Sequence, residues 1–147
     1  MNIKKLRLSV AEYLGIDPLP FKYAEIGIDD SRLDIKNGYV LISNRYSLDT
    51  LETAKCLTHE YRHAYQIFYA AMRKDALASL WRKELEGAVN SETMEDSTSY
   101  YGQLLELDAF AFTKYYLDVY ENTSVVHKDS NYEKLINAYI TKNSDIL

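Results

Sequence analysis

Strand-forming and helix-forming patterns occupy separate parts of this 147-residue chain, and that separation limits the fold more than any other feature. Asn37-Gly38 divides two alternating segments, residues 31–36 and 39–43, and Asn-Gly in this setting is a strong β-hairpin signal. Residues 21–28 read as a further strand, whereas apolar side chains recur at helical spacing from residue 51 onward. Strands followed by helices predict an α+β fold with a small antiparallel N-terminal sheet.

Caps and helix breakers give the expected helix boundaries. A short helix around residues 10–14 should end at Gly15, ahead of Asp17-Pro18-Leu19-Pro20, because proline disfavours helical geometry in the residue before it. A long helix over residues 51–68 has Ser47 or Asp49 available as its N-cap. The remaining expected elements are a helix over 75–86 that stops near Gly87, a loop over 90–99, a helix over 100–120, a break over 122–130 and a last helix over 131–141.

Length and composition favour a single domain over residues 1–147. A formal net charge of -5 leaves no excess of positive charge to attract the phosphates of nucleic acid, so no nucleic-acid partner is expected. One cysteine rules out an intrachain disulfide. No apolar run approaches the roughly 18 residues of a membrane span and no targeting segment is visible, so we expect a cytoplasmic protein without a membrane partner.

Two of the three histidines of the chain form the motif His59-Glu60-Tyr61-Arg62-His63 within the long predicted helix. Side chains four residues apart lie one turn apart on the same helical face, so both imidazoles can reach one metal ion. Glu60 follows the first histidine, where a carboxylate can hold a water molecule and act as a general base. This spacing predicts a zinc site of the metalloprotease kind.

A catalytic zinc site needs a third protein ligand and an open position for water. The helix expected over residues 100–120 is apolar nearly all the way round its first part, and Glu106 and Asp108 are its only charges between Tyr100 and Thr113. A buried carboxylate is costly unless it is paired or binds a metal. Glu106 and Asp108 are therefore both candidates for the third ligand.

These two motifs together resemble those of the gluzincin zinc metallopeptidases. Glu106-Leu107-Asp108-Ala109 is similar to the family's E-x-x-A segment, and the closest resemblance is to the small single-domain minigluzincins, with a more distant one to the ImmA/IrrE metallopeptidases. The resemblance implies a minimal zincin fold, in which a short sheet packs on an active-site helix and a glutamate helix. It also implies hydrolysis of a peptide or protein substrate with Zn²⁺ as the cofactor.

Carried onto this chain, the resemblance makes His59, His63 and Glu106 the zinc ligands and Glu60 the general base. Phe110 stands where the family has Asp or Asn, a residue that orients a ligand histidine. Asp108 is therefore kept as a substitute for that orienting residue or as an alternative ligand. His127 is a candidate donor to the oxyanion of the transition state, as are Tyr100 and Tyr101.

Other functions remain open at the level of sequence. The zinc could stabilise a catalytically silent regulatory or binding domain of the same fold, although such a domain has no use for Glu60. A di-iron bundle would need a second E-x-x-H, and the residue three before His127 is Ser124. A mononuclear iron site with two histidines and a carboxylate would leave Glu60 unexplained. A monomer or small oligomer is expected.

Overall fold

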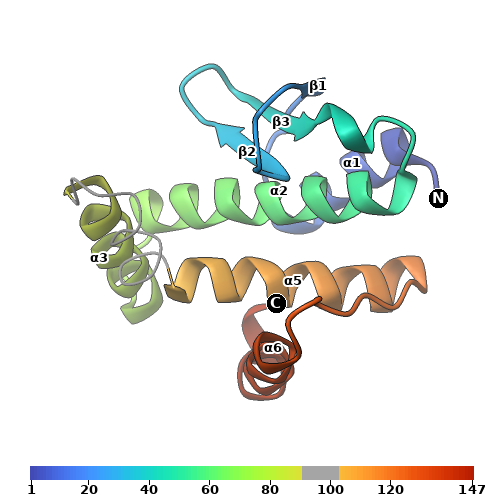
Figure 1. The fold of residues 1–147 in the computed structure, drawn as a ribbon. Coiled ribbons are helices and arrows are strands. Elements are labelled where there is room, and N and C mark those ends of the chain that lie inside the picture. Colours follow the sequence, from blue (N-terminus) through green and yellow to red (C-terminus); the bar gives the residue numbers. More distant parts are fainter. Residues whose placement is uncertain (91–102) are drawn as a thin grey trace. The chain divides into compact units, whose positions relative to one another are not determined.

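The computed structural model describes residues 1–90 and 103–147 and divides the chain into two compact units, Met1–Tyr65 and Gln66–Leu147 (Figure 1). The boundary between the units falls within helix α2 (Thr50–Met72). Residues 91–99 of the predicted loop lie outside the described residues, as do Tyr100 and Tyr101. That residues 1–147 form a single domain stays a prediction.

The first unit opens with helix α1 (Ile3–Leu14), which is longer than the sequence predicted. Asn2 caps its start by accepting a hydrogen bond from the Lys5 backbone N–H, so the helix begins seven residues before the expected position. It ends at Gly15 as predicted, because Gly15 adopts a left-handed conformation with φ of 69°. Leu6, Val10 and Leu14 form its buried face.

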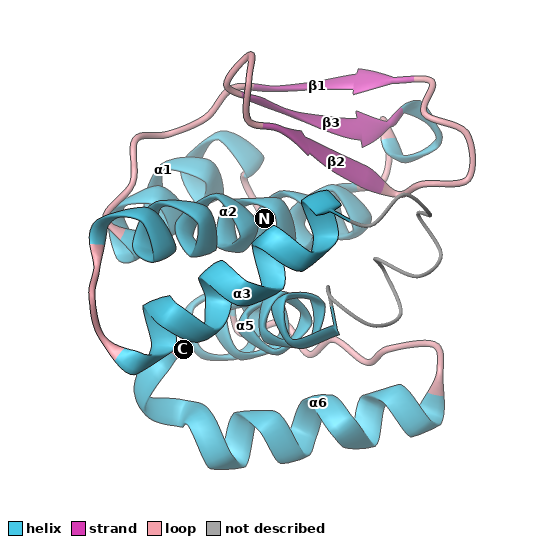
Figure 2. Cartoon of the chain, turned by 90° about the vertical axis from the view of Figure 1, so that its left-hand side faces the viewer, coloured by secondary structure: helices cyan, strands magenta, loops and turns pink. Residues whose placement is uncertain are grey.

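Three strands form a mixed sheet in the order β1-β3-β2 (Figure 2). Strands β2 (Ser31–Asp34) and β3 (Tyr39–Ser43) form the predicted antiparallel hairpin, and Gly38 in its turn has φ of 74°. The prediction of a purely antiparallel sheet is wrong, because β1 (Phe21–Ala24) pairs with β3 in the parallel direction. Alternation identifies a strand but not its direction, and β1 and β2 pair with opposite edges of β3 in opposite directions.

Helix α2 carries the histidine motif, and its start is held by Asp49, which accepts a hydrogen bond from the Glu52 backbone N–H. In the first unit the sheet lies over one side of α2 and α1 lies beside it (Figures 1 and 2). The Tyr23 hydroxyl of β1 lies 2.9 Å from the Thr53 hydroxyl of α2. Val40 and Ile42 of the central strand and Leu57 of α2 are fully buried, so they belong to the core of this unit.

The second unit contains the end of α2 and helices α3 (Ala76–Asn90), α5 (Gln103–Glu121) and α6 (Ser130–Asn143). The predicted stop near Gly87 is wrong, because α3 continues through this residue. A glycine inside a helix costs only about 1 kcal/mol relative to alanine, so Gly87 does not by itself end α3. Helix α6 begins at the cap of Asp129, one residue from the predicted start.

Within the second unit, α5 packs against both α3 and α6. Arg82 of α3 donates to the backbone carbonyls of Ala70 and Arg73 at 2.5 and 2.8 Å, and so satisfies carbonyls at the end of α2. No helix among residues 1–90 and 103–147 has the length and apolar character needed to cross a membrane. The predicted α+β class is confirmed, since a three-stranded sheet and five helices make up the described chain.

Candidate metal centre

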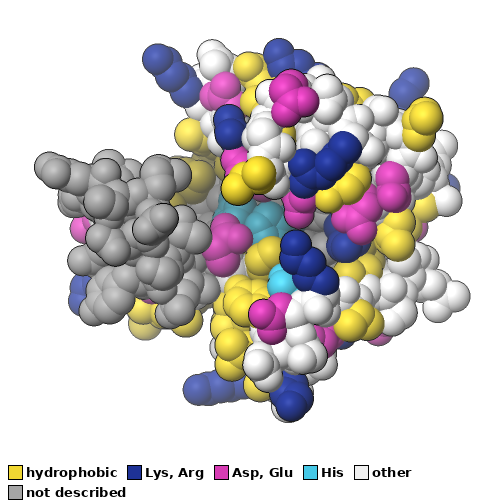
Figure 3. Space-filling model, viewed as in Figure 1, with side chains coloured by type: hydrophobic (Ala, Val, Ile, Leu, Met, Phe, Trp, Pro, Cys, Tyr) yellow, Lys and Arg dark blue, Asp and Glu magenta, His cyan; other side chains and the backbone are white. Residues whose placement is uncertain are grey.

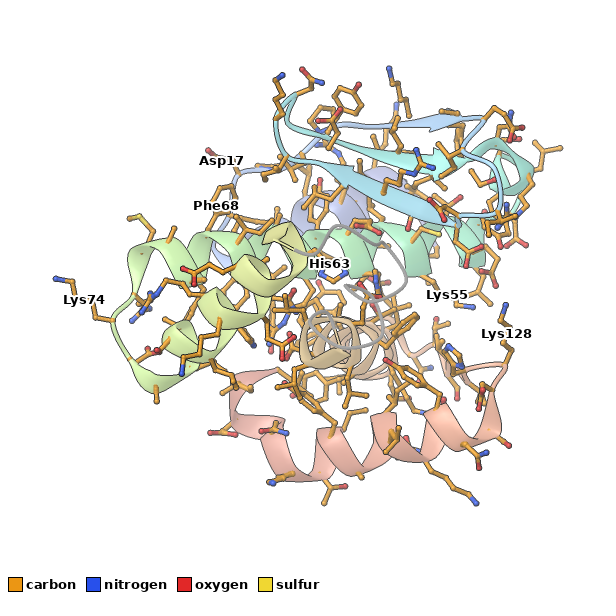
Figure 4. All side chains as sticks on the ribbon, turned by 60° about the vertical axis from the view of Figure 1, so that its left-hand side comes forward. Asp17, Lys55, His63, Phe68, Lys74 and Lys128 are labelled. Atoms are coloured by element: carbon orange, nitrogen blue, oxygen red, sulfur yellow. The ribbon has the colours of Figure 1, made fainter. Side chains whose placement is uncertain are left out.

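The two histidines of the motif face each other on α2. Their Nε2 atoms lie 3.1 Å apart, and their ring centroids are separated by 4.7 Å with an interplanar angle of 86°. Figure 4 shows His63 midway along the helix. The spacing of four residues therefore brings together two nitrogens that are common metal ligands, as the sequence predicted.

The separation of these nitrogens fits a metal ion. Zinc–nitrogen bonds measure about 2.0–2.1 Å, so two Nε2 atoms 3.1 Å apart would subtend an angle of about 100° at the ion, close to tetrahedral. Without an ion, one nitrogen must donate a proton to the other, because two lone pairs at this distance repel. The pair is thus already at a separation suited to binding an ion such as zinc.

Glu60, between the histidines, is held by a residue that the sequence did not single out. Its carboxylate Oε1 accepts a hydrogen bond from the Ser31 hydroxyl at 2.9 Å, and the side chain is only 6% exposed. Ser31 is the first residue of β2, so the sheet of the first unit reaches the motif on α2. No local signal could have identified Ser31, because it lies 29 residues before Glu60 in the chain.

Cys56 lies one helical turn before Glu60 and is buried. Burial raises the pKa of its thiol to about 12, although a hydrogen bond with Ser31 acts in the opposite direction. The thiol donates to the backbone carbonyl of Asp30 at 3.8 Å. At neutral pH Cys56 is therefore a thiol and not a thiolate, so it packs as a small apolar residue.

The two carboxylates of α5 have different environments. Asp108 is fully buried, and its oxygens accept hydrogen bonds from Gln66 Nε2 and from the Tyr139 hydroxyl, each at 2.7 Å. Glu106 is half-buried. Burial raises the pKa of Tyr132 to about 12, and the electrostatic effect of Glu106 adds to this shift, so Glu106 lies close to Tyr132 on α6. Asp108 thus belongs to the core of the second unit.

His127 lies in an aromatic cluster before α6. Its ring centroid is 5.1 Å from that of Phe110 and 4.9 Å from that of Tyr132. Its Nδ1 accepts a hydrogen bond from the Asp129 backbone N–H at 3.0 Å. Phe110, which departs from the family pattern, therefore has a packing role. Because Nδ1 of His127 accepts this hydrogen bond, the neutral imidazole carries its proton on Nε2.

The molecular surface drawn in Figure 3 carries acidic and basic side chains side by side, with hydrophobic side chains between them. Among the residues that the structure describes, this face shows no extended area of Lys and Arg side chains.

Comparison with known proteins does not assign the chain to a family. No protein-family model matches it, and neither the curated proteins nor the solved structures include a match. The side chains of the candidate metal centre are therefore the features of this chain that point to a function.

Proposed function

We propose that this protein is a zinc-dependent metallopeptidase of minimal zincin fold, with Glu60 as the general base. The proposal depends above all on one observation, which is that His59 and His63 present their Nε2 atoms 3.1 Å apart while Glu60 is held by Ser31. A purely structural metal site needs only its metal ligands, whereas an oriented carboxylate beside those ligands serves the activation of water.

Glu106 is the proposed third ligand. Together with His59 and His63 it supplies two imidazole nitrogens and one carboxylate oxygen, a donor set that could hold a metal ion and that suits catalytic zinc. Asp108 is the weaker candidate, because both of its oxygens already accept hydrogen bonds in a fully buried environment. Recruiting Asp108 to a metal would break contacts that stabilise the core.

Zinc in this site would lower the pKa of a water molecule toward about 7 and polarise the peptide carbonyl. Glu60 would accept a proton from the attacking water and donate it to the leaving amine. Because Ser31 donates its hydrogen bond to Oε1 of Glu60, Oε2 would carry the proton transfer. His127 is the proposed donor to the developing oxyanion, through the Nε2–H that its contact with Asp129 leaves in place.

Metal analysis of the full-length chain, purified without added metal, tests the zinc site. We expect about one zinc per chain, and loss of that zinc in His59→Ala because one of three protein ligands is removed. His127→Ala is the matched control, since it removes the third histidine of the chain and should keep the zinc. Iron in place of zinc, or no metal at all, would contradict the proposal.

Ser31→Ala is expected to lower peptide hydrolysis about tenfold, because Glu60 loses a hydrogen bond that orients its carboxylate. The zinc content should not change. Hydrolysis of a mixture of quenched-fluorescent peptides measures the effect. Ser31→Thr keeps the hydroxyl and should retain most of the activity, whereas equal losses in the two variants would count against an orienting role.

A further inference from the structure

A buried carboxylate connects three helices of the second unit. Asp108 of α5 accepts a hydrogen bond from Gln66 of α2 at one oxygen and from Tyr139 of α6 at the other, each at 2.7 Å. Asp108 is fully buried and Gln66 is 1% exposed. A carboxylate removed from water is costly unless donors satisfy it, so these directed contacts determine how the helices fit together.

Gln66 makes a second contact with the same helix. Its Nε2 also donates to the backbone carbonyl of Leu105 at 2.9 Å. Leu105 and Asp108 lie on either side of Glu106 in the chain, so a single amide group holds α5 on both sides of the proposed ligand. A slip of one residue would move the helix by about 1.5 Å and turn its side chains by about 100°, which would break both contacts.

Gln66 also shares a face of α2 with the proposed histidine ligands. The helix is continuous over Thr50–Met72, and steps of four and three residues from His59 to His63 to Gln66 stay on one helical face. Hydrogen bonds from Gln66 hold α5 against the part of α2 that belongs to the second unit.

We infer that the Gln66–Asp108 pair positions Glu106 for metal binding by setting the register of α5 on α2. The inference rests on the proposed zinc site and gives Gln66 and Asp108 an effect on metal affinity without contact with the metal. Ligand atoms must lie within a few tenths of an ångström of their required places. Partners that orient metal ligands typically change metal affinity by about 10–100-fold.

Zinc affinity of the full-length chain, measured by competition with a chromophoric zinc chelator, tests this role. Gln66→Met removes both hydrogen bonds but keeps the length of the side chain, and its affinity should fall about tenfold. Tyr139→Phe is the matched control, because it removes one hydrogen bond from the same carboxylate and leaves Gln66 in place. Its affinity should change by less than about threefold.

Asp108→Asn is a conservative variant that should preserve zinc affinity. The asparagine keeps an oxygen for Gln66 and offers its amide to the Tyr139 hydroxyl, so near wild-type affinity is expected. If Gln66→Met does not fold by circular dichroism, Gln66→Asn takes its place. Its shorter amide cannot reach both acceptors, so it should weaken zinc binding to a similar extent.

Unchanged zinc affinity in the folded Gln66 variant would overturn the inference. The inference would also be overturned if the Gln66 and Tyr139 variants lost zinc affinity equally and the loss followed the fall in their melting temperatures. That result would indicate that the Gln66–Asp108 pair acts only on stability. A wild-type chain that binds no zinc would instead remove the proposed function. If zinc binding is lost in His59→Ala but unchanged in the Gln66 variant, only the positioning role of Gln66 would be excluded.

Discussion

Glu60→Gln is expected to lower peptide hydrolysis by about 10²–10⁴-fold while the zinc content stays the same. The glutamine keeps the shape of the side chain and an oxygen for the Ser31 hydroxyl, but it cannot accept a proton from water. Both imidazole ligands remain in place, so metal binding should not suffer. The measurement is the rate of peptide cleavage per zinc-loaded chain, with zinc determined by elemental analysis.

Glu52→Gln provides the control for this variant. Glu52 lies two turns earlier on α2, where it pairs with Lys55 at 2.9 Å, and its replacement removes the same charge from the same helix. Hydrolysis should then be close to that of the wild type. Retained hydrolysis in Glu60→Gln would exclude Glu60 as the general base. A zinc-loaded wild type that cleaves no peptide would favour the zinc-stabilised regulatory domain instead.

Glu106→Ala is expected to weaken zinc binding by more than about 100-fold, because a metal ligand contributes more than a partner that only orients one. Asp108→Ala should reduce zinc affinity by only about tenfold, through loss of the Gln66 contact. Its main effect should be on the free energy of unfolding, with a loss of about 1–3 kcal/mol, because Gln66 and Tyr139 lose a buried acceptor.

Two separate measurements distinguish these carboxylates. Competition with a zinc chelator gives the affinity, and urea unfolding of the metal-free chain gives the stability of each variant. Glu106 is half-buried, so Glu106→Ala should change the stability of the metal-free chain by less than Asp108→Ala. Stronger loss of zinc in Asp108→Ala than in Glu106→Ala would reassign the third ligand to Asp108.

Local signals in the sequence predicted those parts of the fold that depend on neighbouring residues. Asn37-Gly38 placed the hairpin because its turn needs a left-handed residue, and Gly15 ended α1 for the same reason. The parallel direction of β1 was not predicted, because pairing with β3 joins residues 19 apart in the chain at Phe21 and Val40. The end of α3 was also misplaced, because a single glycine costs a helix only about 1 kcal/mol and Gly87 does not stop it.

The same division applies to the candidate metal centre. The sequence by itself determined that His59 and His63 face each other, since a spacing of four residues on a helix fixes their relation through the backbone alone. Only the tertiary structure revealed the hydrogen bond from Ser31 to Glu60 and the different burial of Asp108 and Glu106. Those contacts join residues 29, 42 and 31 positions apart, and such contacts depend on how helices and strands pack, which no local pattern encodes.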